Sequence, residues 1–342
     1  MDGGTVRVGL VGCGGVAGWH AGNLGGIAGV EIAGLADPND ESVRRIKAAV
    51  PALAGVPAFG SAEELYAAVA LDAVEINTPH TLHHGQVLEA LDHGLHVLCE
   101  KPMACSPEDA RAIADRAALG DRLMTVSYQR RVDPAYSYLR RVVASGELGE
   151  IQTASVTVGQ NWKSLTAGSW RQDPSLSGGG MLMDSGSHLV EALLALTGQP
   201  VAAVAATVDD AGSPVDINAT ALVRFAGGAQ GQITVIGDLA TVWIERVLVS
   251  GTGGVLVYET DPQHPWRTGR VQHYRDGTVI QPLGLPAPFP SMDAAWIAAI
   301  RGTAENPAPA EIGVAVADLT DAIYRAARTG QVVEPTAAVL AD

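Results

Sequence analysis

The stretch VGLVGCGGVAGWH, residues 8–20, contains a glycine pattern that organises the amino-terminal half of the chain. Its first four residues continue an apolar run typical of a strand, and G-x-G-x-x-A follows from Gly12 to Ala17. In such a pattern the first glycine permits a tight turn, the second lets the backbone approach a pyrophosphate, and the alanine keeps the next helix close to the sheet. We predict a strand, a phosphate-binding turn and a helix, although each glycine within that helix costs up to about 1 kcal/mol. The residues predicted to contact the cofactor here are Gly12, Gly14, Gly15 and Val16.

A carboxylate stands where the second strand should end. Asp37 lies 20 residues beyond Ala17, at the end of the apolar run 30–37. A carboxylate at this place accepts hydrogen bonds from the adenosine ribose hydroxyls and repels a 2′-phosphate, so the pattern predicts NAD rather than NADP. The simpler alternative is a glycine-rich turn followed by an aspartate that caps the turn DPND.

The first 125 residues alternate short apolar runs with longer amphipathic ones. Strands are expected at 5–12, 30–37, 73–78, 96–100 and 123–128, with helices between them, for example at 61–70 and 106–119. Strands that alternate with helices indicate right-handed βαβ units and a parallel sheet. We therefore predict an α/β Rossmann domain, with helices on both faces of its sheet, over residues 1–125.

The pattern changes after about residue 150, where apolar runs follow one another with few helices between them. Strands are expected at 151–158, 218–225, 229–236, 243–250 and 254–260, and late helices around 291–301 and 314–328. Gly227-Gly228 and Asp276-Gly277 join pairs of strands and are typical of hairpins. We predict an α+β domain over residues 126–342 with a large, mostly antiparallel open sheet.

The composition excludes several classes of partner. The chain has 342 residues and a net charge of −15, from 22 basic and 37 acidic side chains, which argues against nucleic acid and anionic membrane surfaces. The three cysteines form neither a CxxC pair nor a disulfide framework. Residues 1–10 lack the basic and apolar segments of a secretory signal, and no apolar run reaches the roughly 18 residues of a membrane span. We expect a soluble cytoplasmic protein.

Polar residues follow two neighbouring strands of the predicted parallel sheet. NTPHTLHH, residues 77–84, comes after one strand, and EKP, residues 100–102, comes after the next. Ligands of open α/β sheets bind outside the carboxyl ends of the strands. The residues that this rule brings to one rim are Thr78, Pro79, His83, Glu100 and Lys101.

A second constellation lies in WRQDPSLSGGGMLMDSGSH, residues 170–188. Asp184 and His188 are four residues apart, so on a helix they would share one face. The glycines 178–180 before them would let a ligand approach the start of that helix. The structural alternative is an amphipathic helix with a solvated aspartate and a histidine satisfied in the core.

Together these motifs resemble the Gfo/Idh/MocA oxidoreductases, the family of glucose–fructose oxidoreductase and inositol dehydrogenase. The resemblance rests on GCGGVAGWH, ADP, NTPHTLHHGQVLEALDHGLHVLCEKPMA, YQRRVDPAY and SGELGEI, and on the residues 170–188 quoted above. It covers residues 6 to about 198 motif by motif and the rest more loosely. It implies that His188 is the general base, that Asp184 orients substrate and imidazole, and that Lys101 hydrogen-bonds the reacting oxygen.

The resemblance also assigns secondary positions around the site. It implies that His83, Glu100, Trp170 and Arg171 belong to the cofactor side, and that Tyr128, Asn161 and Lys163 face the substrate together with the catalytic residues. Packing is an equally good interpretation of Tyr128 and Arg131. Glu100 and Pro102 shape the turn, and the Lys101-Pro102 bond can be cis. His80, His83 and His84 lack nearby carboxylate partners, so no metal is predicted.

The leading interpretation is an NAD-dependent oxidoreductase acting on a secondary alcohol of a cyclic polyol, sugar or sugar derivative. One alternative is an NAD-containing glycosidase that uses transient oxidation without net redox change, and another is a non-catalytic NAD-responsive regulator. The resemblance implies a homodimer or homotetramer formed through the open face of the second sheet. The alternating strands after residue 215 favour this, since one apolar face would otherwise stay uncovered.

Overall fold

The computed structural model describes residues 4–261, 263–264, 268–282, 285 and 287–335, which pack into two compact units. The first contains Met1–Ala104, Glu108–Tyr128 and Phe289–Gly313, and the second contains Cys105–Pro107, Gln129–Pro288 and Val314–Asp342. A segment from the far end of the chain therefore belongs to the first unit. The predicted division into domains at 1–125 and 126–342 stays a prediction, because compact units are not the same as segments that fold independently.

The first unit is built on a six-stranded parallel sheet in the order β3-β2-β1-β4-β5-β6, which confirms the predicted Rossmann fold. Its central strands are continuous apolar runs buried on both faces, as parallel strands between two layers of helices must be. The strands are β1 (Val6–Val11), β2 (Val30–Ala36), β3 (Ala58–Phe59), β4 (Ala73–Ile76), β5 (His96–Cys99) and β6 (Met124–Val126). The two-residue β3 was not predicted, because so short a strand has no readable period.

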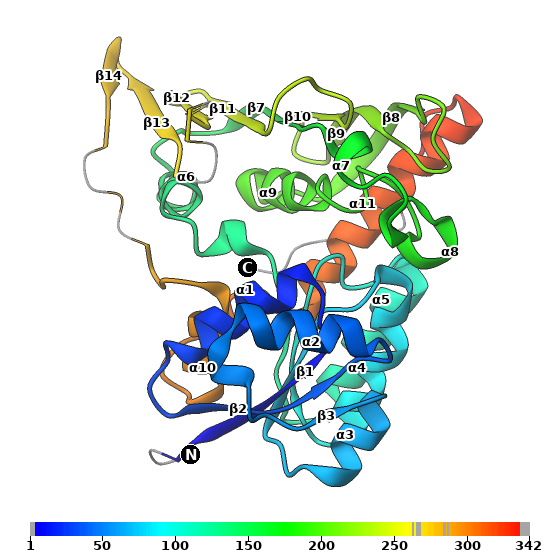
Figure 1. The fold of residues 1–342 in the computed structure, drawn as a ribbon. Coiled ribbons are helices and arrows are strands. Elements are labelled where there is room, and N and C mark those ends of the chain that lie inside the picture. The colour runs from blue at the N-terminus through cyan, green and yellow to red at the C-terminus, as the bar shows by residue number, and fades with distance from the viewer. Residues whose placement is uncertain (1–3, 262, 265–267, 283–284, 286, 336–342) are drawn as a thin grey trace. The chain divides into compact units, whose positions relative to one another are not determined.

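Two helices of this unit, α2 and α3, begin at a side-chain cap. The Asn39 side chain accepts from the Glu41 N–H, and the Ser61 side chain accepts from the Glu64 N–H. The helices are α1 (Gly15–Gly25), α2 (Asp40–Ala49), α3 (Ala62–Ala68), α4 (His83–Asp92), α5 (Pro107–Ala118) and α10 (Met292–Ile300). Figure 1 shows α10, in orange, beside α1, in dark blue, and the two helices are in contact.

Helix α1 forms despite its glycines because one face is fully packed. Ala17, His20, Ala21 and Leu24 are its buried residues, a spacing of three and four positions that places them on a single stripe. Tertiary packing thus overrides a poor helix propensity. The presence of a histidine on this otherwise apolar stripe is taken up below.

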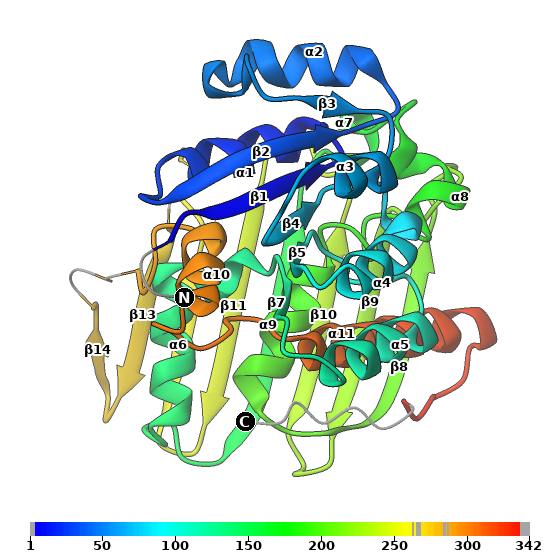
Figure 2. The same ribbon diagram turned by 90° about the horizontal axis from the view of Figure 1, so that it is seen from below.

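The second unit is built on an eight-stranded sheet in the order β14-β13-β12-β11-β7-β10-β9-β8. Neighbours are antiparallel except for β7 and β10, and the predicted hairpins join β9 to β10 and β13 to β14. The strands are β7 (Ile151–Gly159), β8 (Val201–Asp209), β9 (Asn218–Phe225), β10 (Gln230–Ile236), β11 (Ile244–Gly251), β12 (Gly254–Glu259), β13 (Arg270–Arg275) and β14 (Thr278–Ile280). Figure 2 shows them side by side. The sequence did not predict β8, since its alanines have low strand propensity.

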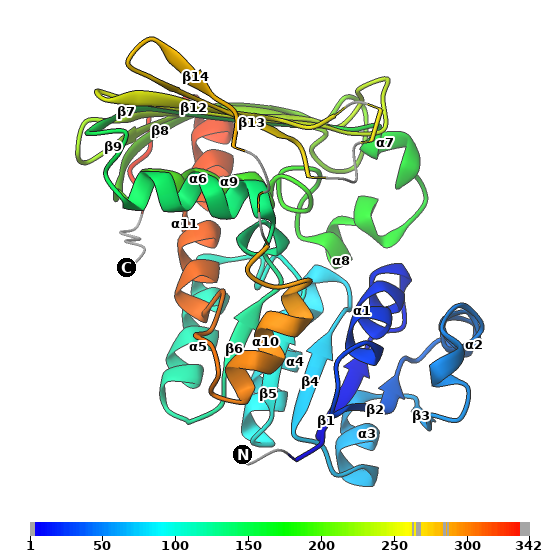
Figure 3. The ribbon, with the colours of Figure 1, turned by 90° about the vertical axis from the view of Figure 1, so that its left-hand side faces the viewer.

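Helices cover one face of this sheet. Figure 3 shows α6 and α9 on the same side of it, and α9 is in contact with β7 and β10. The helices are α6 (Pro134–Ala144), α7 (Trp162–Leu165), α8 (Pro174–Ser177), α9 (Ser187–Thr197) and α11 (Ala310–Thr329), the last of which begins in the first unit. Among the described residues, no helix combines the length and the apolar character that crossing a membrane requires.

Candidate active site

The glycine-rich turn lies between the end of β1 and the start of α1. Gly12 has a φ of 86°, and a Cβ there would come within 2.8 Å of the Asn77 carbonyl group, so only glycine fits. Gly14 and Gly15 differ, because a Cβ on either would meet nothing within 4 Å. The packing of the protein itself therefore does not require glycine at these two positions. A pyrophosphate that lies against the backbone at a helix N-terminus does require it, because a side chain would occupy the same space.

The turn opens on a cavity of about 220 Å³ between α1 and α2, lined in part by Gly14, Gly15 and Arg45. Asp37 lies beside the turn, at the end of β2, where its Oδ2 accepts from the Cys13 N–H at 2.8 Å and its Oδ1 accepts from the Asn39 N–H at 2.8 Å. The carboxylate is thus fixed in place. Burial, together with the charge of Asp37, raises the pKa of the Cys13 thiol to about 12, so the thiol stays protonated at neutral pH.

The turns after β4 and β5 are tied together by His83. Its imidazole is fully buried, with Nδ1 2.7 Å from the Pro102 carbonyl oxygen and Nε2 2.9 Å from the Thr78 carbonyl oxygen. Thr78 is anchored in addition by its hydroxyl, which donates to Gln86 Oε1 at 2.5 Å. The side chain of His83 therefore links the two turns in the interior and does not itself line an open surface.

Lys101 lies two residues beyond the end of β5 and is half-buried, and the Lys101-Pro102 peptide bond is cis. The backbone N–H of Glu100 donates to the Ile76 carbonyl oxygen at 2.9 Å, which extends the pairing of β4 and β5 by one residue. The Glu100 side chain is only 7% exposed and turns inward. The Glu100 carboxylate is thus directed into the interior, and the assignment of this residue to the cofactor side stays a prediction.

In the second unit, Asp184 and His188 are both buried at the start of α9. The prediction that they share one face of a helix was wrong, because α9 begins at Ser187 and Asp184 lies in the turn before it. The Ser187 hydroxyl bridges the two segments by donating to the Asp184 carbonyl oxygen at 2.8 Å. Gly186 at the helix boundary ends the turn, and a Cβ on it would overlap the Leu182 carbonyl oxygen at 2.5 Å.

Asp184 is held by two donors from different segments of the second unit. Its Oδ2 accepts from Trp162 Nε1 at 2.8 Å and from Arg171 Nε at 3.0 Å. The Arg171 guanidinium also stacks on the neighbouring Trp170 ring at 4.5 Å. The predicted residues Trp170 and Arg171 thus build the surroundings of Asp184, and Trp162 joins them, although the sequence did not single it out.

The other residues predicted to face the substrate fall into two groups. Tyr128 belongs to the first unit and is fully buried, which agrees with the packing interpretation. Asn161 and Lys163 flank the start of α7 in the second unit, and the Lys163 ammonium donates to the Ala211 carbonyl oxygen at 2.5 Å. Arg131 forms an ion pair with the buried Glu191 at 2.7 Å.

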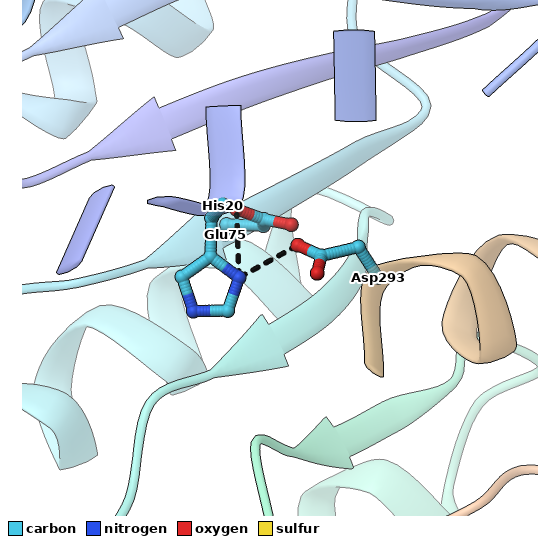
Figure 4. A group of neighbouring side chains, drawn as sticks. All are labelled: His20, Glu75 and Asp293. Atoms are coloured by element: carbon cyan, nitrogen blue, oxygen red, sulfur yellow. Dashed lines mark hydrogen bonds and ion pairs between the residues drawn. The ribbon is translucent and has the colours of Figure 1, made fainter. Parts of the chain in front are cut away.

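One buried group in the first unit escaped the sequence-based reasoning. His20, Glu75 and Asp293 offer nitrogen and oxygen atoms that all lie within 4.8 Å of one another (Figure 4). Such atoms can hold a cation, but His20 Nδ1 and Asp293 Oδ1 are only 2.6 Å apart, the length of a direct charge-assisted hydrogen bond. Two ligands of one tetrahedral zinc, each about 2.0–2.2 Å from the metal, stand farther apart than this. A glutamate inside the apolar run AVEI was the one sequence feature that pointed to this group.

The parallel sheet, the glycine-rich turn and the fixed carboxylate after β2 define a dinucleotide-binding protein. Two family models match the chain: one described as an oxidoreductase family with an NAD-binding Rossmann fold, over residues 6–128, and one described as the GFO/IDH/MocA C-terminal domain, over residues 136–257. D-xylose 1-dehydrogenase (NADP(+)) 2 of Haloferax volcanii is 32% identical over 82% of this chain and 86% of the relative. The chain belongs to the GFO/IDH/MocA family of oxidoreductases, as its motifs predicted.

Two further similarities are informative. Inositol 2-dehydrogenase of Corynebacterium glutamicum is 35% identical over 43% of each chain. The crystal structure of the WlbA dehydrogenase from Bordetella pertussis, in complex with NADH and UDP-GlcNAcA, superposes with a TM-score of 0.80 at 24% identity and covers 96% of this chain and 98% of that one. At this identity the structural likeness shows the fold, and the fold agrees with the predicted one.

Proposed function

We propose that the chain is an NAD-dependent dehydrogenase that acts on a secondary alcohol of a sugar, a sugar derivative or a cyclic polyol. The observation that carries the proposal is a complete set of reactive side chains, namely Lys101 after β5 and the buried Asp184 and His188 at the start of α9. Membership of the family adds support, since related chains carry the names of xylose and inositol dehydrogenases.

The residues of the first unit fit a dinucleotide. Gly14 and Gly15 would leave room for the pyrophosphate at the start of α1, and the Asp37 carboxylate would accept hydrogen bonds from the adenosine ribose hydroxyls. A 2′-phosphate at the same place would meet the negative charge of Asp37, which is why we propose NAD in preference to NADP. When bound, the nicotinamide supplies the hydride-accepting carbon.

In the second unit, His188 would take the proton of the substrate hydroxyl as a general base. Imidazole suits this step because its ordinary pKa lies near neutrality. Asp184, immobilised by Trp162 and Arg171, would orient the substrate and the imidazole, since its carboxylate cannot change position without losing both donors.

Lys101, from the first unit, would donate a hydrogen bond to the reacting oxygen. Negative charge develops on that oxygen as its proton leaves, and a positioned ammonium stabilises the charge. The rigid support of the turn by His83 and by the backbone pairing of Glu100 favours this role, because catalytic groups have to be held close to their productive geometry.

The experiment that tests the proposal measures NADH formation from NAD with a panel of inositols, hexoses, pentoses and their derivatives. For each substrate found, His188→Ala should lower kcat by roughly a hundred- to ten-thousand-fold, the usual contribution of a general base. His264→Ala, which alters an exposed histidine of the same unit, is the matched control and should leave kcat unchanged. A Lys101→Ala variant that keeps turnover within about tenfold of the parent, about 1.4 kcal/mol of transition-state stabilisation, would contradict the assignment.

A further inference from the structure

Four ionisable side chains from distant segments meet in the interior of the first unit. His20 comes from α1, Glu75 from β4, Glu100 from the residue after β5, and Asp293 from α10. They are 1%, 1%, 7% and 0% exposed. Figure 4 shows the carboxyl groups of Glu75 and Asp293 both directed at the same ring nitrogen of His20, Nδ1. No part of the proposed reaction uses this group, and burying so many charges is costly unless they are paired.

The geometry of His20 favours its protonated form. Its Nδ1 lies 2.6 Å from Asp293 Oδ1, and its Nε2 lies 3.2 Å from Glu100 Oε1. When Asp293 and Glu100 are both ionised, their oxygens only accept hydrogen bonds, so both ring nitrogens of His20 donate, as they do in the imidazolium. Asp293 is held in place for this bond by Asn23 on the same helix α1, whose amide donates to Asp293 Oδ2 at 2.8 Å.

The charges of the group balance only if one acid is neutral. His20 and the adjoining Lys101 supply two positive charges, which Glu100 and Asp293 match. Glu75 is the third carboxyl, and its Oε2 lies 3.8 Å from His20 Nδ1, beyond hydrogen-bond distance. A neutral Glu75 leaves the interior without net charge.

The direction of each pKa agrees with this assignment. Burial opposes the charge on His20, but the hydrogen bonds to Asp293 and Glu100 favour the charged form, and its pKa is raised well above the ordinary value. Burial raises the pKa of Glu75 well above its ordinary value. For Glu100, burial is outweighed by the hydrogen bond and charge of His20, which bring its pKa to about 2. For Asp293 the hydrogen bond from His20 likewise outweighs burial and lowers the pKa.

We infer that His20 is a positioning residue for Lys101: its buried imidazolium, held by Asp293 of α10, fixes the Glu100 carboxylate and with it the turn that presents the lysine. The turn is then pinned twice, by the Glu100 backbone bond to Ile76 on β4 and by the Glu100 side chain on α1. Because α1 starts at the glycine-rich turn, one helix supports both the cofactor loop and the lysine turn. The inference rests on the proposed function for the catalytic role of Lys101.

The test compares two isosteric variants, each of which replaces one carboxyl of the group by an amide. Asp293→Asn removes the counter-charge of His20, so we expect kcat to fall about tenfold or more while KM for NAD changes less than threefold. Glu75→Gln replaces an acid that is already neutral. Its kcat should therefore stay within twofold of the parent value, and its Tm within about 2 °C. The alkaline limit of activity should move to lower pH in Asp293→Asn alone, because its histidine loses a proton more readily.

Two measurements report on the group without activity. Hydrogen exchange of the peptide covering residues 97–106 should be faster in Asp293→Asn than in the parent, and unchanged in Glu75→Gln. Nitrogen NMR shifts of His20, assigned by their absence in His20→Gln, should show both ring nitrogens protonated at pH 7. If His20→Gln does not fold, the comparison of the two carboxyl variants still decides the question.

Three results would overturn the inference. Equal losses in Asp293→Asn and Glu75→Gln would show that Glu75 is not the neutral member, and stoichiometric metal in the purified protein would replace the proton-based account with a metal site. A neutral His20 at pH 7 would remove the charge on which the argument depends. The parent protein could also be inactive on every substrate and still give the expected exchange and NMR results. That outcome would contradict the proposed function but not the support of the turn by His20.

Discussion

Single carboxyl groups in this chain differ in role because their exposure differs. Asp37 is half-exposed at a strand end, and its oxygens keep acceptor capacity after binding two backbone N–H groups. Glu100 is buried and its carboxylate is committed to His20. Both residues end a strand of the same sheet, and the direction of the side chain leaves the Asp37 carboxylate half-exposed and commits the Glu100 carboxylate to the interior.

The first prediction at this scale concerns cofactor choice. Asp37→Ser should raise the ratio of kcat/KM for NADP over NAD at least tenfold, because it removes the charge that repels a 2′-phosphate and the acceptor for the ribose hydroxyls. Initial rates with both cofactors measure the ratio. Asp40→Ser, an exposed acid at the start of α2, is the control. Equal turnover of NAD and NADP by the parent would contradict the assigned role.

The second prediction at this scale concerns pH. The pKa of Glu100 is lowered on folding to about 2, so the group stabilises the fold fully above its unfolded value of about 4.5 and loses that contribution as pH falls through this window. The stability gap between the parent and Glu100→Gln should therefore be largest near pH 6 and shrink below pH 4.5. Urea unfolding from pH 3 to 7 measures it, and a gap independent of pH would show that the carboxylate is not selectively stabilised as an anion.

At the scale of elements, the turn before α9 is the feature that the sequence misplaced. Its glycines let the chain pass against Asp216, whose Oδ1 accepts from the Gly180 N–H at 2.6 Å and whose Oδ2 accepts from the Leu182 N–H at 2.9 Å. The Tyr324 hydroxyl of α11 donates to the same carboxylate at 2.7 Å. Asp216 thereby shapes the segment that carries Asp184.

We predict that Gly180→Ala destabilises the protein and impairs turnover. A Cβ at this position would overlap the backbone of Asp216, and overpacking of this kind costs about 1–3 kcal/mol. Thermal unfolding and kcat measure the two effects, which should occur together because the same turn holds Asp184. Gly22→Ala is the matched control: its Cβ meets nothing within 4 Å in α1, so it should leave Tm unchanged or raise it.

At the scale of the molecule, the eight-stranded sheet has helices α6 and α9 on one face (Figure 3). Its strands alternate, so the other face carries every second side chain, as in β9 and β11. Leu222 is 61% exposed there and Leu248 is 36% exposed. Apolar side chains on an open sheet face are typical of a surface that pairs with another copy of the chain.

We predict a homodimer or homotetramer that uses this face. Light scattering at micromolar concentration should give a multiple of the 35.2 kDa chain mass. The double variant Leu222→Lys and Leu248→Lys should shift the protein toward monomer, since charges would be buried in the contact. Leu119→Lys, at an 83% exposed leucine of the first unit, is the control. A monomeric parent protein would refute the prediction.

Much of the fold followed from local patterns. Apolar runs, hairpin glycines and helix caps act over a few residues, so they predicted both sheets, the parallel character of the first and the hairpins in the second. Short or alanine-rich strands such as β3 and β8 were missed because their formation depends on neighbours across the sheet and not on their own residues. The family motifs and the candidate site residues could also be recognised in the sequence, since each depends on residue type and spacing.

The sequence by itself determined the fold class, the family and the residue types available for catalysis, because these are recorded in short-range order along the chain. Only the tertiary structure decided which side chains meet. Asp293 is more than 200 residues from His20 in sequence, and no periodic pattern links them, yet packing of α10 against α1 brings them to 2.6 Å. The charge states of such a group depend on burial and on neighbours from several segments, so they arise only when the chain is folded.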